Sequence, residues 1–206
     1  MFWKSLNLWT EEEKRIHQCL AEALQELINQ HVIKHTNDEK TVTGRLRPIL
    51  RIACKRRKLN WSVHFEASSF DKDTDPNPSG HPDIQLARLD KDNNQYNYDI
   101  ECKLVRVKRP KKTWDYCVHY VKDGVMRYQS GKYGQSNPPM GTMLGYIQEG
   151  NSVLLLKSVN EEAKNQGISI IQPNGMIMFS KVKKLSQKLK KHNRQFTLHH
   201  LWVDFQ

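Results

Sequence analysis

Hydrophobic positions along the chain recur with two periods, one typical of helices and one typical of strands. Apolar residues at helical spacing predict a first helix over residues 10–33, with Thr10 as its N-terminal cap. A second helix is predicted after the capping residues at 36–38, and it ends in a basic turn at 55–58. Pro48 lies inside this second pattern, so a kink or a break there is compatible with it.

The second half of the chain carries further helical patterns. Residues 152–166 predict an amphipathic helix that Gly167 is placed to end, and residues 116–129 have mixed helical spacing. Glycine, serine and proline gather at 130–139, which predicts a loop. Residues 140–148 then predict one more short helix.

Alternation of apolar and polar residues predicts the strands. Residues 84–87 and 98–104 form an expected antiparallel pair, because the polar run between them suits a hairpin turn. The other expected strands lie at 61–67, 168–171, 176–179 and 196–205, with a turn-rich link at 172–175. Alternation also sorts the side chains of the second hairpin strand by face. Glu101 and Lys103 share one face, and Ile100, Cys102 and Leu104 share the other.

Size and composition indicate one soluble domain. The chain has 206 residues, and we expect a single domain over 1–206, with N-terminal helices at 10–58, a catalytic sheet core at 61–107 and a region of helices and C-terminal strands at 114–206. A mean hydropathy of −0.76 and the lack of a long apolar run argue against a membrane span or a signal peptide. Four scattered cysteines suggest a reducing compartment, so a cytoplasmic location is expected.

The charge balance changes the picture, because 33 basic against 22 acidic residues give a net charge of +11. Such an excess is typical of proteins that bind polyanions, above all nucleic acids. Candidate phosphate contacts are the basic residues of two runs, namely Lys108, Arg109, Lys111, Lys112, Lys183 and Lys184. The basic turn at 55–58 has two readings, a complement to the helix dipole or a phosphate contact. The tyrosines between 114 and 150 either form core or stack on bases.

The predicted hairpin carries the candidate chemistry. It would bring Asp83, Glu101 and Lys103 to one end of the strand pair. Hydrolysis of a phosphodiester needs charge neutralised on the phosphate and a water made nucleophilic, and Mg²⁺ held by one or two carboxylates does both. The backbone carbonyl of Cys102 is a candidate further ligand. Lys103 would orient the attacking water or stabilise developing charge.

Pro82-Asp83 followed by Glu101-Cys102-Lys103 on a hydrophobic strand resembles the PD-(D/E)XK, or restriction-endonuclease-like, nuclease superfamily. The resemblance implies an α/β fold, a mixed β-sheet flanked by α-helices, which agrees with the order of elements above. It also implies a magnesium-dependent nuclease, with Mn²⁺ able to substitute, that acts on DNA in a restriction, repair or phage-defence setting. The superfamily places an acid on the helix before the sheet. Glu39 is the best match, with Glu22 and Glu26 as rivals.

Several alternatives stay open at this point. His81 is either an auxiliary group that moves a proton or touches phosphate, or a loop histidine. The protein could be a non-catalytic nucleic-acid-binding or assembly subunit that keeps the nuclease fold, or its site could act on RNA. A homodimer, or a partner ATPase or sensor subunit, would be compatible with the sequence.

Overall fold

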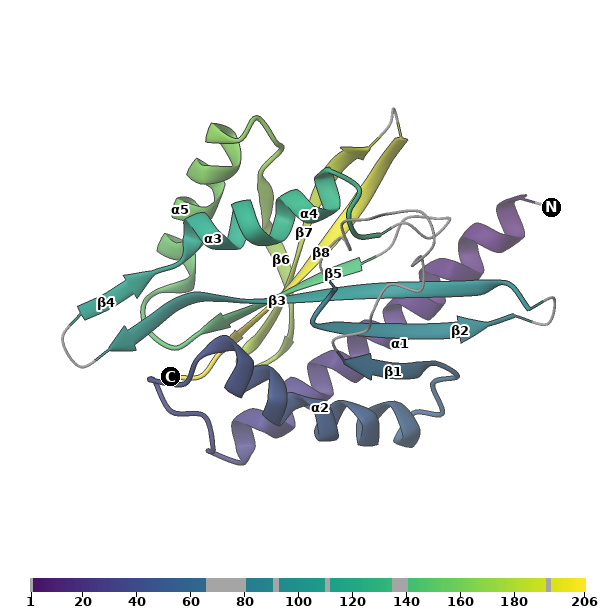
Figure 1. Cartoon of the computed structure of the whole chain (residues 1–206), viewed down its shortest axis with the longest axis horizontal. Coiled ribbons are helices and arrows are strands. Elements are labelled where there is room, and N and C mark those ends of the chain that lie inside the picture. Colours follow the sequence, from purple (N-terminus) through teal and green to yellow (C-terminus); the bar gives the residue numbers. More distant parts are fainter. Residues whose placement is uncertain (1, 66–80, 91–92, 110–111, 135–140, 192–193) are drawn as a thin grey trace.

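The structure is a computed structural model that describes residues 2–65, 81–90, 93–109, 112–134, 141–191 and 194–206. Its centre is an open eight-stranded mixed sheet (Figure 1). The pairs β3–β5 and β5–β8 are parallel and the other pairs are antiparallel. The strands along the sheet are β1 (Ser62–Phe65), β2 (Ile84–Leu89), β3 (Gln95–Arg109), β5 (Gly141–Ile147), β8 (Arg194–Asp204), β7 (Val182–Lys191) and β6 (Ile171–Phe179), with β4 (Lys112–Asp115) paired to β3.

Helices cover both faces of this sheet (Figure 1). On one face lie α1 (Phe2–Asn29) and α2 (Glu39–Arg56), and on the other lie α3 (Cys117–Tyr120), the π-helical turn η1 (Val121–Val125), α4 (Met126–Gln129) and α5 (Ser152–Asn165). Each face has its own buried core, and β3 contributes Tyr98, Ile100, Cys102 and Leu104 to the core on the α1 side and Val105 to the other. The prediction of an α/β fold with a mixed sheet flanked by helices is confirmed at this level.

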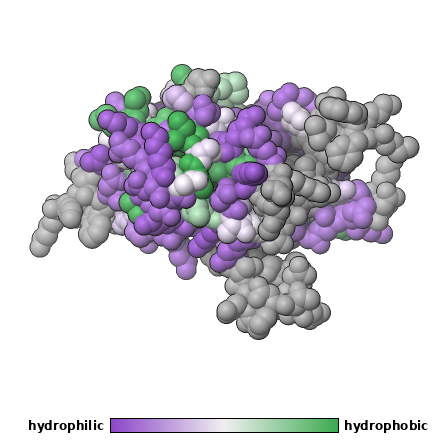
Figure 2. Space-filling view, turned by 90° about the horizontal axis from the view of Figure 1, so that it is seen from above, coloured by the Kyte–Doolittle hydropathy of each residue, from purple (hydrophilic) through white to green (hydrophobic). Residues whose placement is uncertain are grey.

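The face with α3 to α5 is largely hydrophilic, with apolar residues gathered over part of it (Figure 2). Exposed apolar side chains on these helices include Val118, Val153 and Leu154. Within the residues that the structure describes, no helix is long and apolar enough to cross a membrane.

Two helix predictions are confirmed nearly to the residue. The side chain of Asp38 caps α2 by accepting a hydrogen bond of 2.8 Å from the Thr41 amide. Pro48 does not break this helix, which continues to Arg56. The amphipathic helix α5 ends just before Gly167, whose φ of +67° suits a glycine after a helix end.

The predicted limits of the first helix are wrong at both ends. The helix begins at Phe2 rather than at Thr10, and it ends at Asn29. Thr10 is therefore an interior residue. The residues before it are already helical, so a capping residue at this position does not begin the helix.

The helix predicted at 140–148 is wrong, because this segment forms strand β5. All seven residues of β5 are buried, and the strand lies in parallel contact with β3 and β8. A strand covered on both faces has no polar side to alternate with, so its apolar run does not show the period of a strand.

The two strands predicted at 168–171 and 176–179 are one strand, β6. The link at 172–175 lies within it, at a shift in the pairing register with β7 between Gln172 and Met176. Because β6 is the last strand of the sheet, Pro173 is tolerated at a position that an inner strand would not allow.

The predicted hairpin of β2 and β3 is confirmed as an antiparallel pair, with Ile84 opposite Ile100. Residues 91–92 of its turn lie outside the described residues. The described part of the turn includes Asn93 at a φ of +62°, a conformation that asparagine adopts more readily than most residues. The last strand, predicted at 196–205, is β8.

Candidate active site at the open edge of β3

One edge of β3 lacks a strand partner between Ile100 and Arg106 within the described residues, and two carboxylates lie along it. Strand β2 pairs with β3 up to Ile100, and β4 pairs with it from Arg106 onward. Between these points the Cys102 amide donates to Asp83 Oδ2 at 2.7 Å, and the Leu104 amide donates to Glu39 Oε2 at 3.1 Å. The carboxylates thus take the place of a neighbouring strand, which satisfies amides that would otherwise cost roughly 1–3 kcal/mol each.

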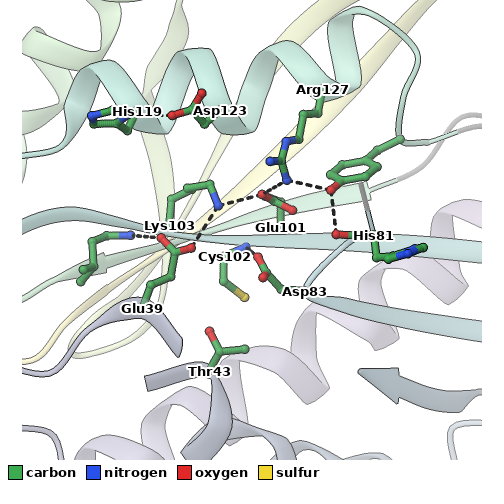
Figure 3. Close-up of polar contacts among 12 residues, drawn as sticks. Glu39, Thr43, His81, Asp83, Glu101, Cys102, Lys103, His119, Asp123 and Arg127 are labelled. Atoms are coloured by element: carbon green, nitrogen blue, oxygen red, sulfur yellow. Dashed lines mark hydrogen bonds and ion pairs between the residues drawn. The ribbon is translucent and has the colours of Figure 1, made fainter. Parts of the chain in front are cut away.

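Glu101 and Lys103 project from β3 toward α3 and α4, on the face opposite to Cys102 (Figure 3). The Lys103 ammonium lies 2.8 Å from Glu101 Oε1 and 3.0 Å from Glu39 Oε1. The Glu101 side chain is only 1% exposed and that of Lys103 is 12% exposed. The structure therefore brings together Asp83, Glu101, Lys103 and Glu39, as the sequence predicted.

Sequence reasoning missed Arg127, which belongs to α4 and completes this cluster (Figure 3). Its Nη1 donates to Glu101 Oε1 at 2.6 Å and to the Tyr133 hydroxyl at 2.8 Å. The Tyr133 hydroxyl in turn donates to the backbone carbonyl of His81 at 2.8 Å. Arg127 lies 26 positions from Glu101 in the sequence, and the helical pattern at 116–129 was the only signal near it.

His81 enters this cluster through its backbone. Its imidazole ring lies on the far side of its own main chain from Glu101 (Figure 3). The role predicted for the ring, as a proton carrier or a phosphate contact, stays a prediction.

A π-helical turn lies where the helix crosses Lys103. Gly124, within η1, approaches so closely that a Cβ there would lie 3.4 Å from Lys103 Cγ and would overlap the Met143 methyl. Single π-helical turns inside helices often occur at functional sites. Here the turn seats the helix against β3 two residues before Arg127.

Burial and mutual repulsion shift the protonation of the acids. Burial, followed by the charge of Asp83, raises the pKa of Glu101 to about 7, although Lys103 opposes the shift. Burial also raises the pKa of Glu39, with Lys103 again opposing it. Burial by itself would lower the pKa of Lys103, but Glu101 and Glu39 outweigh it and raise that pKa. Lys103 therefore stays charged at neutral pH.

The chemistry of these donors fits a divalent cation with oxygen ligands. Glu101 Oε2 is buried and accepts no hydrogen bond in the described part of the chain, since Lys103 and Arg127 both bind Oε1. Because the amide and the carbonyl of a strand residue face the same side, the Cys102 carbonyl faces the same open edge as Asp83. Mg²⁺ commonly uses one or two protein carboxylates and keeps several waters. No group of three or more His, Cys, Asp or Glu residues that could hold a metal was found among the described residues.

The rival acids lie elsewhere. Glu22 binds Arg57, and Glu26 lies 3.6 Å from Arg56, so both are engaged between α1 and the end of α2. In the basic turn at 55–58, two residues, Arg56 and Arg57, therefore neutralise acids of α1. The role of Glu39 as a third metal ligand stays a prediction, since its carboxylate contacts Lys103 and the Leu104 amide.

The predicted phosphate contacts are only partly visible. Lys111 lies outside the described residues, and the side chains of Lys108, Arg109 and Lys112 are likewise not described. Lys183 lies half-buried on β7. The neighbouring Lys184 turns inward and donates to His17 Nδ1 at 2.8 Å.

The tyrosines of the second half are mostly core. The structure buries Tyr120, Tyr128, Tyr133 and Tyr146 almost completely, which leaves their rings no access to stack on a base. The packing interpretation of these four residues is therefore confirmed.

A second polar cluster lies on the α1 face of the sheet. His17 Nε2 lies 2.8 Å from the Tyr98 hydroxyl and 3.0 Å from Thr142 Oγ1, while its Nδ1 accepts from Lys184. Burial, together with the charge of Lys184, lowers the pKa of His17 well below its ordinary value. We refer to these four residues, His17, Tyr98, Thr142 and Lys184, as the His17 network.

No protein-family model, curated protein or solved structure matches this chain. We therefore infer function from the geometry and the charge of the site itself.

Proposed function

We propose that this protein is a metal-dependent nuclease that hydrolyses phosphodiester bonds, with DNA as its substrate and Mg²⁺ as its metal. The observation that carries the proposal is the meeting of Asp83 and Glu101 beside Lys103, with the buried Oε2 atom of Glu101 unpartnered in the described part of the chain. The resemblance of these residues to the PD-(D/E)XK motif, and with it the restriction-endonuclease-like fold, belongs to the same proposal.

Each side chain has a role that its contacts support. Asp83 and Glu101 would hold the metal, with the Cys102 carbonyl beside them. When bound, the metal supplies neutralisation of phosphate charge and activation of a water. Lys103, kept charged by two carboxylates, would orient the attacking water or stabilise the negative charge that develops on the phosphate. Arg127 would hold Glu101 so that Oε2 stays available.

The test is cleavage of plasmid, linear and single-stranded DNA in Mg²⁺, Mn²⁺ or EDTA. We expect nicking or cutting that needs the metal, and a loss of about 10²- to 10⁴-fold in Asp83→Asn and Glu101→Gln. Both variants keep an oxygen acceptor, so the hydrogen bond to Cys102 survives in the first. Glu161→Gln, an exposed acid on α5, is the matched control and should cut like the wild type.

Two outcomes would contradict the proposal. Metal-dependent cutting that persists in both variants would remove these residues from the mechanism. A wild type that binds DNA in a salt-sensitive way but cuts no DNA or RNA with either metal would favour the second candidate, a non-catalytic nucleic-acid-binding subunit. The net charge of +11 supports this candidate. Preferential cutting of RNA would indicate that RNA, and not DNA, is the substrate.

A further inference from the structure

Four basic residues share one side of α2, and we name them the α2 basic ridge: Lys40, Arg47, Arg51 and Lys55. Steps of seven, four and four residues return to the same side of a helix that has about 3.6 residues per turn. Lys40, Arg51 and Lys55 are exposed and Arg47 is half-buried. The ridge extends about 22 Å along the helix at a rise of 1.5 Å per residue.

Two of these residues are held in place by an aromatic ring. The guanidinium carbons of Arg47 and Arg51 each lie 4.9 Å from the centre of the Phe65 ring on β1. Stacking of this kind restrains a long side chain without neutralising its charge. The middle of the ridge is therefore ordered before anything binds.

The stability of the fold does not account for the ridge. Arg47, Arg51 and Lys55 place like charges four residues apart, which costs a helix about 0.2–0.5 kcal/mol per pair. Lys40, Arg51 and Lys55 have no acidic partner within the described residues, whereas Arg56 and Arg57 at the end of the helix bind acids of α1. The acids of α1 thus neutralise the cations at the end of the helix, and Lys40, Arg51 and Lys55 keep their charge in the described part of the chain.

The ridge begins beside the candidate active site. Lys40 follows Glu39, whose carboxylate contacts the Lys103 ammonium at 3.0 Å. Between Lys40 and Arg47 on the same side lies Gly44, where an added Cβ would meet nothing within 4 Å. A bound strand can therefore lie along the helix without a bulky side chain in the gap.

We propose that the α2 basic ridge binds the phosphate backbone of duplex DNA next to the site of cleavage. The occupant follows from charge complementarity, because phosphates along a backbone are the repeating negative partner that a line of cations fits. The choice of DNA rests on the proposed function. The contacts carry no base specificity, so the ridge sets where the duplex lies and not which sequence is cut.

The experiment measures binding of a fluorescent duplex DNA by anisotropy over a range of salt concentrations, in EDTA so that nothing is cut. The ridge variant replaces Arg51 and Lys55 with glutamine. The matched control makes the same charge change at Lys157 and Lys164, two exposed lysines of α5 on the other face of the sheet. Circular dichroism verifies that both variants fold.

We expect the ridge variant to bind more weakly and to lower the slope of log K against log salt by about 2, while the control stays like the wild type. Equal losses in both variants would reduce the effect to net charge and overturn the proposal, as would no loss in either. Tighter, equally ridge-dependent binding of duplex RNA would overturn the choice of DNA. Because binding is measured without metal, a wild type that never cuts refutes the proposed function and leaves this result to stand alone.

Discussion

The two polar clusters of this protein differ in place and in composition: the His17 network lies on the α1 face of the sheet, and the candidate active site extends from the open edge of β3 to the face with α3 and α4. The candidate active site combines three acids with Lys103 and Arg127, so it is held by charge. The His17 network touches one carboxylate, because the Tyr98 hydroxyl also donates to Glu13 Oε1 at 3.3 Å, and burial and the charge of Lys184 hold its histidine neutral. In the network both ring nitrogens of His17 have a partner. In the site a buried carboxylate oxygen has none within the described residues.

The difference separates a cluster that we interpret as structural from the one that we propose to be catalytic. A buried polar group without a partner is costly, and a bound ion or water is one way in which such a group is satisfied. A network with its partners in place fixes the packing of α1 on the sheet and offers nothing for a ligand to complete. We therefore expect changes to the site to alter chemistry, and changes to the network to alter stability.

The largest expected effect comes from exchanging the lysine of each cluster. Lys103→Met should lower metal-dependent cleavage by about 10²- to 10⁴-fold, since it removes the cation beside the proposed reacting phosphate. Lys184→Met should leave cleavage near the wild type and lower the free energy of unfolding by about 1–2 kcal/mol. Initial rates on plasmid DNA and urea unfolding measure the two quantities. Equal loss of activity in both variants would contradict the assignment of catalysis to one cluster and stability to the other.

A smaller effect is expected at Arg127, which acts through Glu101. Groups that orient a metal ligand typically change affinity or activity by about 10- to 100-fold. Arg127→Gln should weaken Mn²⁺ binding by that amount, as measured by calorimetry on the metal-free protein. Arg127→Lys should restore part of it. Unchanged Mn²⁺ affinity in Arg127→Gln would reduce this residue to a packing role.

The smallest effect sharpens the comparison through pH, because the two clusters shift in opposite senses. The pKa of His17 lies well below 6.5, and burial lowers that of His200 to about 3, so the stability that neutral histidines provide is lost as pH falls below 6.5. The pKa of Glu101 is raised from 4.5 to about 7, so its contribution is complete below 4.5 and is lost as pH rises through about 7.

Urea unfolding between about pH 5 and 8 checks this sign, with slopes of up to about 1.4 kcal/mol per pH unit for each group. His17→Gln should flatten the loss of stability on acidification. Glu101→Gln should steepen it, because the compensating proton uptake disappears. The same slope in the wild type and both variants would mean that neither group is shifted as described.

The sequence predicted those parts of the site whose geometry is local. Glu101 and Lys103 share a face because they are two residues apart on a strand, and this holds wherever the strand lies. Asp83 reaches Cys102 because the hairpin fixes the register of β2 against β3. Arg127 could not be predicted, since its contact with Glu101 depends on how a helix with a π-helical turn packs on the sheet.

The contrast between local and long-range geometry also explains the errors in the predicted fold. Strands β2 and β3 could be predicted from the sequence because polar and apolar residues alternate in their solvent-exposed parts. Strand β5 lies between two parallel neighbours. Its apolar sequence is compatible with a helix or a strand, and the surrounding fold, which the local sequence does not encode, decides between them. The interruption in β6 is tolerated only because nothing pairs with its outer side in the described structure.

The open edge of β3 has a consequence for the solubility of variants. Asp83 and Glu39 occupy the amides of Cys102 and Leu104, and a free row of strand donors is a template on which another chain can add itself. Replacing both acids with alanine would bare that row while removing two negative charges. Such a protein would be prone to join copies edge to edge, so we expect the acids of the proposed active site also to prevent the sheet from adding a further strand.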